Sequence, residues 1–236
     1  MKIFRKIRHQ LLRENIISKY LFYAVGEIIL VVIGILIALQ INNWNTERIK
    51  RNVENQYYQN IKRQINEDKQ EIIGCINYNN KRLKLFNFGT QIIEKNDRSK
   101  LDTLGSIALK LTDYSDFLRQ GNIYETMVNS GEIKLLNNTA IVEEIRRLEE
   151  KYIYINKLEE IHRDLVLNMI VKDLSDIFKL ATREVRQEEE IFSIKFQNVI
   201  VVFVSIMDEK DEVYNEALDK IQEITELIDK ELDIEN

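Results

Sequence analysis

The chain has 236 residues, a formal net charge of −5, one cysteine and no proline. A lone cysteine excludes an internal disulfide, so any folded domain must be held together by packing. The acidic balance argues against nucleic-acid binding, and the sequence holds no Gly-rich phosphate loop, Walker motif, G-x-S-x-G or H-E-x-x-H. We therefore expect a non-enzyme, with no catalytic, cofactor-binding or metal-binding residues.

Residues 1–19 form a basic segment. Apolar residues recur in it at helical spacing, and only Glu14 opposes its six basic residues, Lys2, Arg5, Lys6, Arg8, Arg13 and Lys19. A short amphipathic basic helix of this kind can lie on an anionic inner leaflet or contact a partner. The simpler interpretation is a flank that sets the direction of membrane insertion.

Leu21 to Ile41, LFYAVGEIILVVIGILIALQI, is the only run that is typical of a membrane span. A helix of this length covers about 30 Å, the thickness of a bilayer's hydrocarbon core. Its apolar core is too long for a cleaved signal peptide, and no A-x-A-like site follows it, which favours an uncleaved signal anchor.

Two polar residues, Glu27 and Gln40, lie within the run. One interpretation places Glu27 near the headgroups, where a carboxylate costs less than at mid-membrane. The other places it against a partner helix, because Gly26, Gly34 and Ala38 share a narrow face of small residues that favours close helix packing. This face predicts a homo-oligomer as one possibility.

The distribution of basic residues predicts the topology. Six precede the span and only Arg48, Lys50 and Arg51 follow it closely, which favours a cytoplasmic N-terminus. We expect a cytoplasmic flank over 1–19, a transmembrane helix over 20–43 and an extracytoplasmic helical domain over 44–236. The predicted location is the bacterial inner membrane, with the large domain periplasmic or otherwise extracytoplasmic.

The chain after the span keeps helical spacing. Ile49, Val53, Tyr57, Ile61 and Ile65 stand four apart, and Ile72 and Ile76 continue the apolar face. A second apolar pattern follows at Leu83, Phe86 and Ile93. The span is thus expected to run directly into an outer helix. Residues 95–102 are typical of a loop, 103–112 and 123–129 of short helices, 113–122 of a turn, and Gly131 of a helix C-terminus.

Two stretches resemble a widespread bacterial family. They are GEIILVVIGILIALQINNWN (26–45), with the basic flank before it, and NIYETMVNSGEIKLLNNTAIVEEIRRLEEKY (122–152). The family is catalogued as domain of unknown function 6090. The resemblance implies a single-pass anchor with a helical outer domain, and it implies no catalytic residues.

A long helix is predicted after 137–139, whose Asn-Asn-Thr can cap it. Its seam, Ile141, Ile145, Leu148, Tyr152 and Ile155, alternates in steps of four and three, as in a coiled coil. Continuing this register puts Glu159 and His162 on the apolar side. We expect the apolar stripe instead to shift by one residue, to Leu158, Ile161, Leu165 and Met169.

The last third is less regular. Residues 183–190 are typical of a charged connector or an exposed turn. Val199 to Ile206 is rich in β-branched residues and is either a strand or, as the neighbouring periodicity favours, a helix buried on all sides. A final acidic helix is predicted from the 3–4 spacing of Tyr214, Ala217, Ile221, Ile224 and Ile228.

Two candidates for chemistry were considered. Glu159 and His162 have the Glu-x-x-His spacing of di-iron ligands, but such a centre needs a second histidine, and His9 lies before the span. Cys75 has no histidine near it in sequence other than His162 and is best interpreted as a small buried residue.

The sequence therefore predicts an all-α protein with one N-terminal transmembrane helix, followed by an extracytoplasmic bundle of about four to six helices with long antiparallel helices. Expected partners are the lipid bilayer, a possible second copy and unknown envelope proteins. The favoured function is non-enzymatic protein interaction or scaffolding. An extracytoplasmic ligand sensor with a separate cytoplasmic partner is the alternative.

Overall fold

The computed structural model describes residues 17–119 and 121–233. The predicted basic flank falls almost entirely on residues 1–16, outside this part. The chain divides into two compact units, residues 1–54 and 55–236. Helix α2, Ile17–Glu94, contributes residues to both, and its secondary structure is helical without a break, as expected.

The first unit contains the predicted span. Side chains from Leu21 to Ile41 are exposed or half-buried, and a Cβ added at Gly26 or Gly34 would meet no atom of the described residues within 4 Å. Among the described residues, α2 contains the one segment that is long and apolar enough to cross a membrane. An apolar helix left uncovered by protein is what a bilayer would cover.

The second unit is built on three long helices: the α2 segment from residue 55, α5 (Thr139–Leu165) and α8 (Ile194–Asp233). Helix α8 runs antiparallel to α2, because Lys62 pairs with Asp229 and Asn79 with Asp211. Helices α2 and α5 run parallel, since Tyr58 bonds the backbone of Asn138 and Asp68 bonds Tyr152. The expected antiparallel arrangement therefore holds for α8 and α2, but not for α2 and α5.

Short elements connect the long helices. They are η1 (Arg98–Lys100), α3 (Leu101–Leu109), η2 (Lys110–Thr112), α4 (Ile123–Ser130), η3 (Glu132–Leu135), the π-helix η4 (Val166–Ile170), α6 (Val171–Ile177), β1 (Phe178–Lys179), β2 (Glu184–Val185) and α7 (Glu188–Ile191). Strands β1 and β2 pair antiparallel, Phe178 with Val185 and Lys179 with Glu184. Residues 183–190 thus hold a strand and a helical turn, where a connector or an exposed turn was expected.

The predicted helix ends are confirmed where local chemistry sets them. The Asn138 side chain caps α5 by accepting from the backbone N–H groups of Ala140 and Ile141, at 3.1 and 3.3 Å. Gly131 ends α4 with φ of 78°, a conformation that suits glycine because it lacks a Cβ.

Two apolar clusters fill the bundle. One joins the 58–75 part of α2 to α5 and to the C-terminal half of α8, and the other joins the end of α2 to α3, η4, α6, α7 and the N-terminal half of α8. The predicted seams of α5 and of the final helix are buried throughout. On α2, however, Tyr58 is buried where Tyr57 was expected, and Tyr57 is half-exposed.

Two predictions for α5 and α8 need correction. The stripe on α5 shifts only in part. Leu158 is buried and Leu165 half-buried, as predicted, but Ile161 and Met169 are exposed, and Glu159, His162, Val166 and Ile170 continue the buried register. The extra residue in the π-turn η4 keeps the later positions on the buried side. Residues 199–206 lie within α8 and are helical, but not buried on all sides, because Val201 and Val202 are both 48 % exposed.

Candidate functional site

The segment from Asp113 to Asn122, hereafter the strap, is the connection that makes the parallel helix pair possible. It has no regular secondary structure where described, and it runs back along α2. Asp113 pairs with Arg82, Ser115 bonds Asn79, and the N–H of Ile123 donates to Gln64, so its contacts move toward the start of α2. Two parallel helices need a connection that returns from the end of one to the start of the other. The strap contributes to this return without forming helix or strand where it is described.

The strap must satisfy its backbone groups without a neighbouring strand, and two charged side chains of the bundle interior provide partners. Glu159 on α5 accepts from the backbone N–H of Phe117 at 2.6 Å and from the Tyr214 hydroxyl at 2.7 Å. Lys210 on α8 donates to the carbonyl of Ser115 at 2.6 Å. A buried backbone group left without a partner would cost about 1–3 kcal/mol, so these charges stabilise an otherwise unfavourable segment.

Glu159 and Lys210 are also an ion pair, with Lys210 Nζ 4.0 Å from Glu159 Oε1. Burial raises the pKa of the Glu159 carboxyl, and the hydrogen bonds from Phe117 and Tyr214 oppose that rise. Burial likewise lowers the pKa of the Lys210 ammonium, and the Glu159 charge opposes that change. Each group thus limits the electrostatic cost of burying the other.

Glu159 and Lys210, together with the polar side chains near them, form what we call the polar layer. Asn79 donates to Asp211 at 2.7 Å, and Arg119 pairs with Glu149. The Phe117 ring packs 5.0 Å from the Tyr152 ring, centroid to centroid. These side chains come from α2, α5, α8 and the strap, so the layer holds four segments together.

His162 lies one turn beyond Glu159 and is 1 % exposed. Its ring is 4.4 Å from that of Phe203, in an edge arrangement, and 5.5 Å from that of Tyr114. Neither ring nitrogen meets a hydrogen-bond partner among the described residues. Burial, with a smaller effect of the Lys210 charge, lowers the pKa of His162 to about 3, so the ring is neutral near pH 7.

Glu159 and His162, the pair with di-iron ligand spacing, make different contacts in the bundle. Both side chains are buried, but Glu159 bonds the strap and His162 packs on aromatic rings. Within the described ranges, no three His, Cys, Asp or Glu side chains gather as metal ligands. Cys75 is buried in the first apolar cluster, and burial raises the pKa of its thiol, which keeps it protonated and unreactive.

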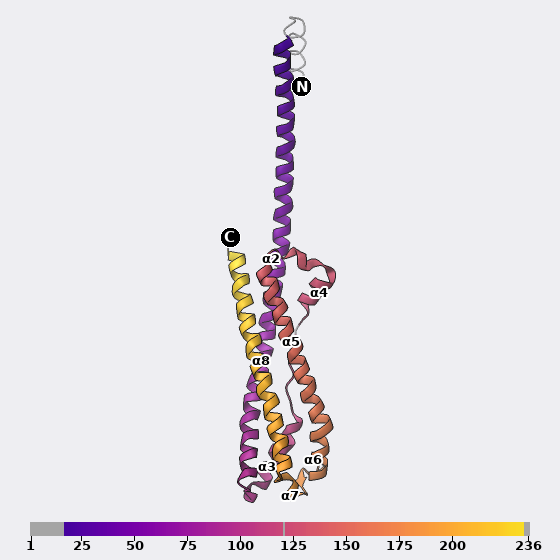
Figure 1. The fold of residues 1–236 in the computed structure, drawn as a ribbon, viewed down its shortest axis with the longest axis vertical. Helices are drawn as coiled ribbons and strands as arrows, with labels where there is room; N and C mark the ends of the chain where they lie inside the picture. The colour runs from indigo at the N-terminus through magenta and orange to yellow at the C-terminus, as the bar shows by residue number, and fades with distance from the viewer. Residues whose placement is uncertain (1–16, 120, 234–236) are drawn as a thin grey trace. The chain divides into compact units, whose positions relative to one another are not determined.

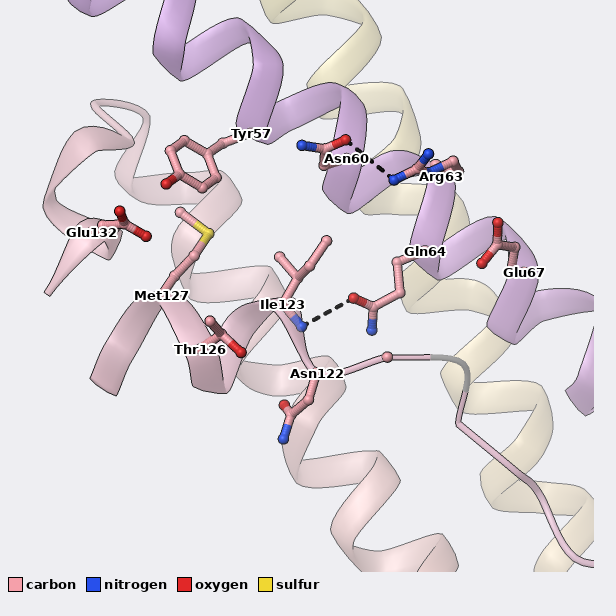
Figure 2. A pocket seen from close by; sticks show the side chains of 11 residues that line it. Tyr57, Asn60, Arg63, Gln64, Glu67, Asn122, Ile123, Thr126, Met127 and Glu132 are labelled. Carbon is pink, nitrogen blue, oxygen red and sulfur yellow. Dashed lines mark hydrogen bonds between the residues drawn. The ribbon is translucent and has the colours of Figure 1, made fainter. Parts of the chain in front are cut away.

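A second feature is a groove between α2 and the α4–η3 region, with a volume of about 340 Å³. Figure 2 shows that its lining is mixed: Tyr57, Gln64 and Glu132 lie beside the apolar side chains of Ile123 and Met127. A hydrogen bond to Glu132, the largest cause, raises the pKa of the Tyr57 hydroxyl. The sequence provides no signal for this groove because its two walls are far apart in the chain.

A third feature is an apolar groove along the seam between α5–η4 and α8, with a volume of about 240 Å³. Leu165, Met169 and Val202 line it, and Asp173, Lys195 and Asn198 stand at one end. We call this surface the seam face. Two of its residues, Leu165 and Met169, belong to the stripe that was expected to be buried.

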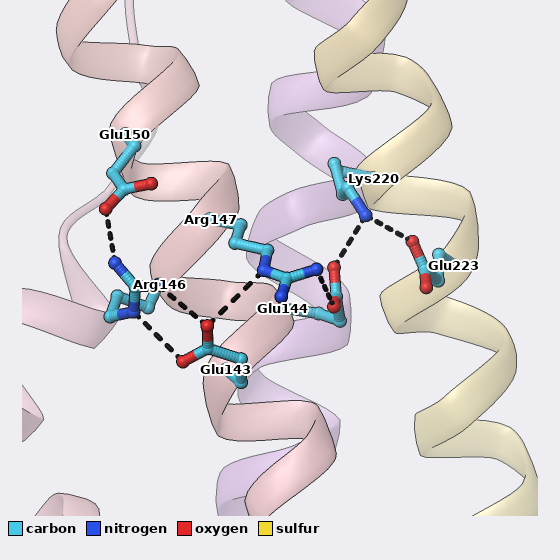
Figure 3. Close-up of polar contacts among 7 residues, drawn as sticks. All are labelled: Glu143, Glu144, Arg146, Arg147, Glu150, Lys220 and Glu223. Carbon is cyan, nitrogen blue, oxygen red and sulfur yellow. Dashed lines mark hydrogen bonds and ion pairs between the residues drawn. The ribbon is translucent and has the colours of Figure 1, made fainter.

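Ion pairs fasten α5 to α8 away from this groove. Figure 3 shows Arg147 between Glu143 and Glu144, and Lys220 between Glu144 and Glu223. The hydrogen bond from Arg146 lowers the pKa of the Glu143 carboxyl to about 2. Because each charge meets its opposite, this network favours helix pairing over recognition of a charged ligand.

Chemically, the polar layer consists of groups that bond one another and the strap, with no exposed nucleophile or base. The fold and these surfaces define an all-α protein that has, within the described residues, one helix suited to crossing a membrane, and a bundle with grooves on its surface. Comparison with known proteins identifies the family of this chain. The chain belongs to a family of unknown function, DUF6090, whose model matches residues 27–208, and the predicted resemblance is confirmed. Neither the curated proteins nor the solved structures contain a match.

The neutral, unpartnered imidazole predicts a specific pH dependence. The unfolded chain binds a proton at His162 near pH 6.5, whereas the folded chain does so only near pH 3. The free energy of unfolding therefore falls as the pH drops below 6.5, by up to about 1.4 kcal/mol per pH unit from this residue. His162→Phe, which keeps an aromatic ring beside Phe203, removes this loss.

Circular dichroism during denaturant unfolding of the detergent-solubilised chain measures the effect. The stability advantage of His162→Phe over the wild type is expected to grow from about pH 7 to about pH 4. A stability difference that stays constant over that range would contradict a buried neutral histidine.

Proposed function

We propose that this protein is a membrane-anchored helical interaction module of the cell envelope that acts without catalysis. The observation that carries the proposal is the seam face, an apolar groove left open on the surface of the bundle. Met169 and Val202 on this groove are 46 % and 48 % exposed. Apolar surface of this kind is costly in water and is typical of a site that another protein covers.

The charge pattern of the chain supports the location of this module. Basic residues concentrate before the span, which favours a cytoplasmic N-terminus and a bundle outside the cytoplasmic membrane. On this topology the bundle faces envelope proteins.

The groove in Figure 2 favours a second candidate, an extracytoplasmic ligand sensor. Its volume of about 340 Å³ lies within the range of small-molecule sites, and its polar and apolar lining could orient a ligand. A sensor of this kind would act with a separate cytoplasmic partner that transmits the signal. The interaction module requires no such component, and we place it first.

Crosslinking tests whether the seam face is covered by protein. A photo-reactive amino acid at Val202 should capture a protein in native membranes, because this residue lines the groove. Val201 is the matched control: it has the same side chain and the same exposure, 48 %, but does not line the groove. Capture at 202 well above that at 201 is expected on immunoblots. Equal or absent capture at both positions would contradict the proposal.

Thiol labelling tests the topology separately. Cys75 is buried, so the probe should be an exposed position such as Thr182→Cys on the β1–β2 turn, in a Cys75→Ala background. We expect a membrane-impermeant maleimide to label this thiol in cells whose outer barrier is permeabilised and whose inner membrane is intact. Labelling that requires lysis of the inner membrane would place the bundle in the cytoplasm.

A further inference from the structure

The groove between α2 and the α4–η3 region has walls that the fold holds in place. Gln64 on α2 is buried, and its side-chain oxygen accepts from the backbone N–H of Ile123 at 3.0 Å. A Cβ at Gly121 would lie 3.0 Å from Gln64 Cδ, so the lack of a side chain there lets this part of the chain approach α2 closely. Met127 on α4 is 2 % exposed and packs in the first apolar cluster. The groove is therefore formed before any ligand arrives, as small-molecule sites usually are.

Two charged side chains on the α2 wall of this groove have no ion-pair partner among the residues that the structure describes. Arg63 and Glu67 both line the groove, one helical turn apart, and they do not pair with each other. Arg63 donates to the side chain of Asn60 at 3.4 Å, which is a long hydrogen bond. An arginine that precedes a glutamate by four residues is the less favourable order for a pair on a helix. One positive and one negative group thus stand ready for a ligand.

The rest of the lining suits a peptide more than a simple ion. The side-chain amides of Asn60, Gln64 and Asn122 can donate to and accept from a peptide group. Figure 2 shows Gln64 between Arg63 and Glu67 along α2, bonded to Ile123 on the other wall. The apolar side chains of Ile123 and Met127 offer a surface to an aliphatic group.

We propose that this groove binds a short zwitterionic peptide that carries an apolar side chain. The carboxylate of the ligand bonds the guanidinium of Arg63, and its ammonium group pairs with Glu67. Its apolar side chain lies against Met127. An anion would leave Glu67 without a partner and a cation would leave Arg63 without one. The inference rests on the second candidate function, the ligand sensor, and names the class of its ligand.

The spacing of the two charges favours a dipeptide over a single amino acid. Four residues of helix rise about 6 Å, which separates Arg63 from Glu67 along α2. The two Cα atoms of a dipeptide are about 3.8 Å apart and its charged termini lie roughly 6 Å apart, whereas both charges of an amino acid sit on one Cα. A groove of about 340 Å³ can hold a ligand of this size.

Calorimetric titration of the full, detergent-solubilised chain tests the inference with three probes. They are alanyl-leucine, alanyl-leucine amide, which lacks the carboxylate, and N-acetyl-alanyl-leucine, which lacks the ammonium group. We expect alanyl-leucine to bind about tenfold more tightly than either of the others, because each of these loses one charge-assisted contact. Equal affinity for all three, or binding of none, would overturn the inference.

Variants assign each charge of the ligand to one side chain. Arg63→Gln should remove the preference for alanyl-leucine over its amide and keep the preference over the N-acetyl form, and Glu67→Gln should do the reverse. Arg163→Gln and Glu160→Gln are matched controls, exposed and away from the groove, and should keep both preferences. Circular dichroism checks that each variant keeps the wild-type helical content. Preferences that both groove variants retain would overturn the assignment.

A separate measurement distinguishes this inference from the proposed functions. A photo-reactive residue at Lys19, before the span, reports capture of a cytoplasmic partner with and without alanyl-leucine. Binding of alanyl-leucine with unchanged capture at 19 would overturn the sensor and leave the peptide site standing. Absence of alanyl-leucine binding, with capture of a protein at 202, would overturn the peptide site and leave the interaction module standing.

Discussion

The bundle depends on the hydrogen bonds that hold the strap to the helices beside it. Two of the long helices, α2 and α5, run parallel, and the chain must travel back between them. It does so as an extended segment whose N–H and C=O groups need partners from the helices that it crosses. Glu159, Lys210 and Gln64 supply those partners, and they occupy positions where a simple bundle would have aliphatic side chains.

That constraint explains the surface as well as the interior. Because Glu159 and His162 take buried positions on α5, the register of the helix stays in place through the π-turn η4. Ile161 and Met169 consequently stand outside the core and are exposed. The apolar seam face is therefore linked to the polar layer: the same helix buries charge on one side and presents aliphatic surface on another. The way in which the strap connects α2 and α5 therefore also determines the apolar surface that we propose as an interface.

The sequence predicted the parts of the fold that depend on local patterns. The span, the seam Ile141 to Ile155, the cap at Asn138 and the helix end at Gly131 all follow from residue spacing or from the chemistry of single residues. The strap did not, because its partners lie some 30 to 95 positions away in the chain. Without knowledge of the strap, a polar Glu159 at an apolar position of α5 indicated that the apolar stripe shifts by one residue.

Tyr57 and Tyr58 show the same limit of predicting burial from the spacing along one helix. Both are adjacent aromatic residues, and the four-residue spacing favoured Tyr57, yet Tyr58 is buried and its hydroxyl accepts from the N–H of Asn138. Which of the two faces inward depends on where α5 begins, which spacing on α2 cannot reveal. The grooves escaped prediction for the same reason, since each has walls from distant segments.

Amide hydrogen exchange at Phe117 tests the central claim most directly. If Glu159 holds the strap, exchange mass spectrometry of a peptide that covers Phe117 should show protection of this amide comparable to that in α5, and Glu159→Leu should abolish that protection while α8 stays protected. Exchange of the Phe117 amide in the wild-type chain at the rate of an open loop would contradict the account.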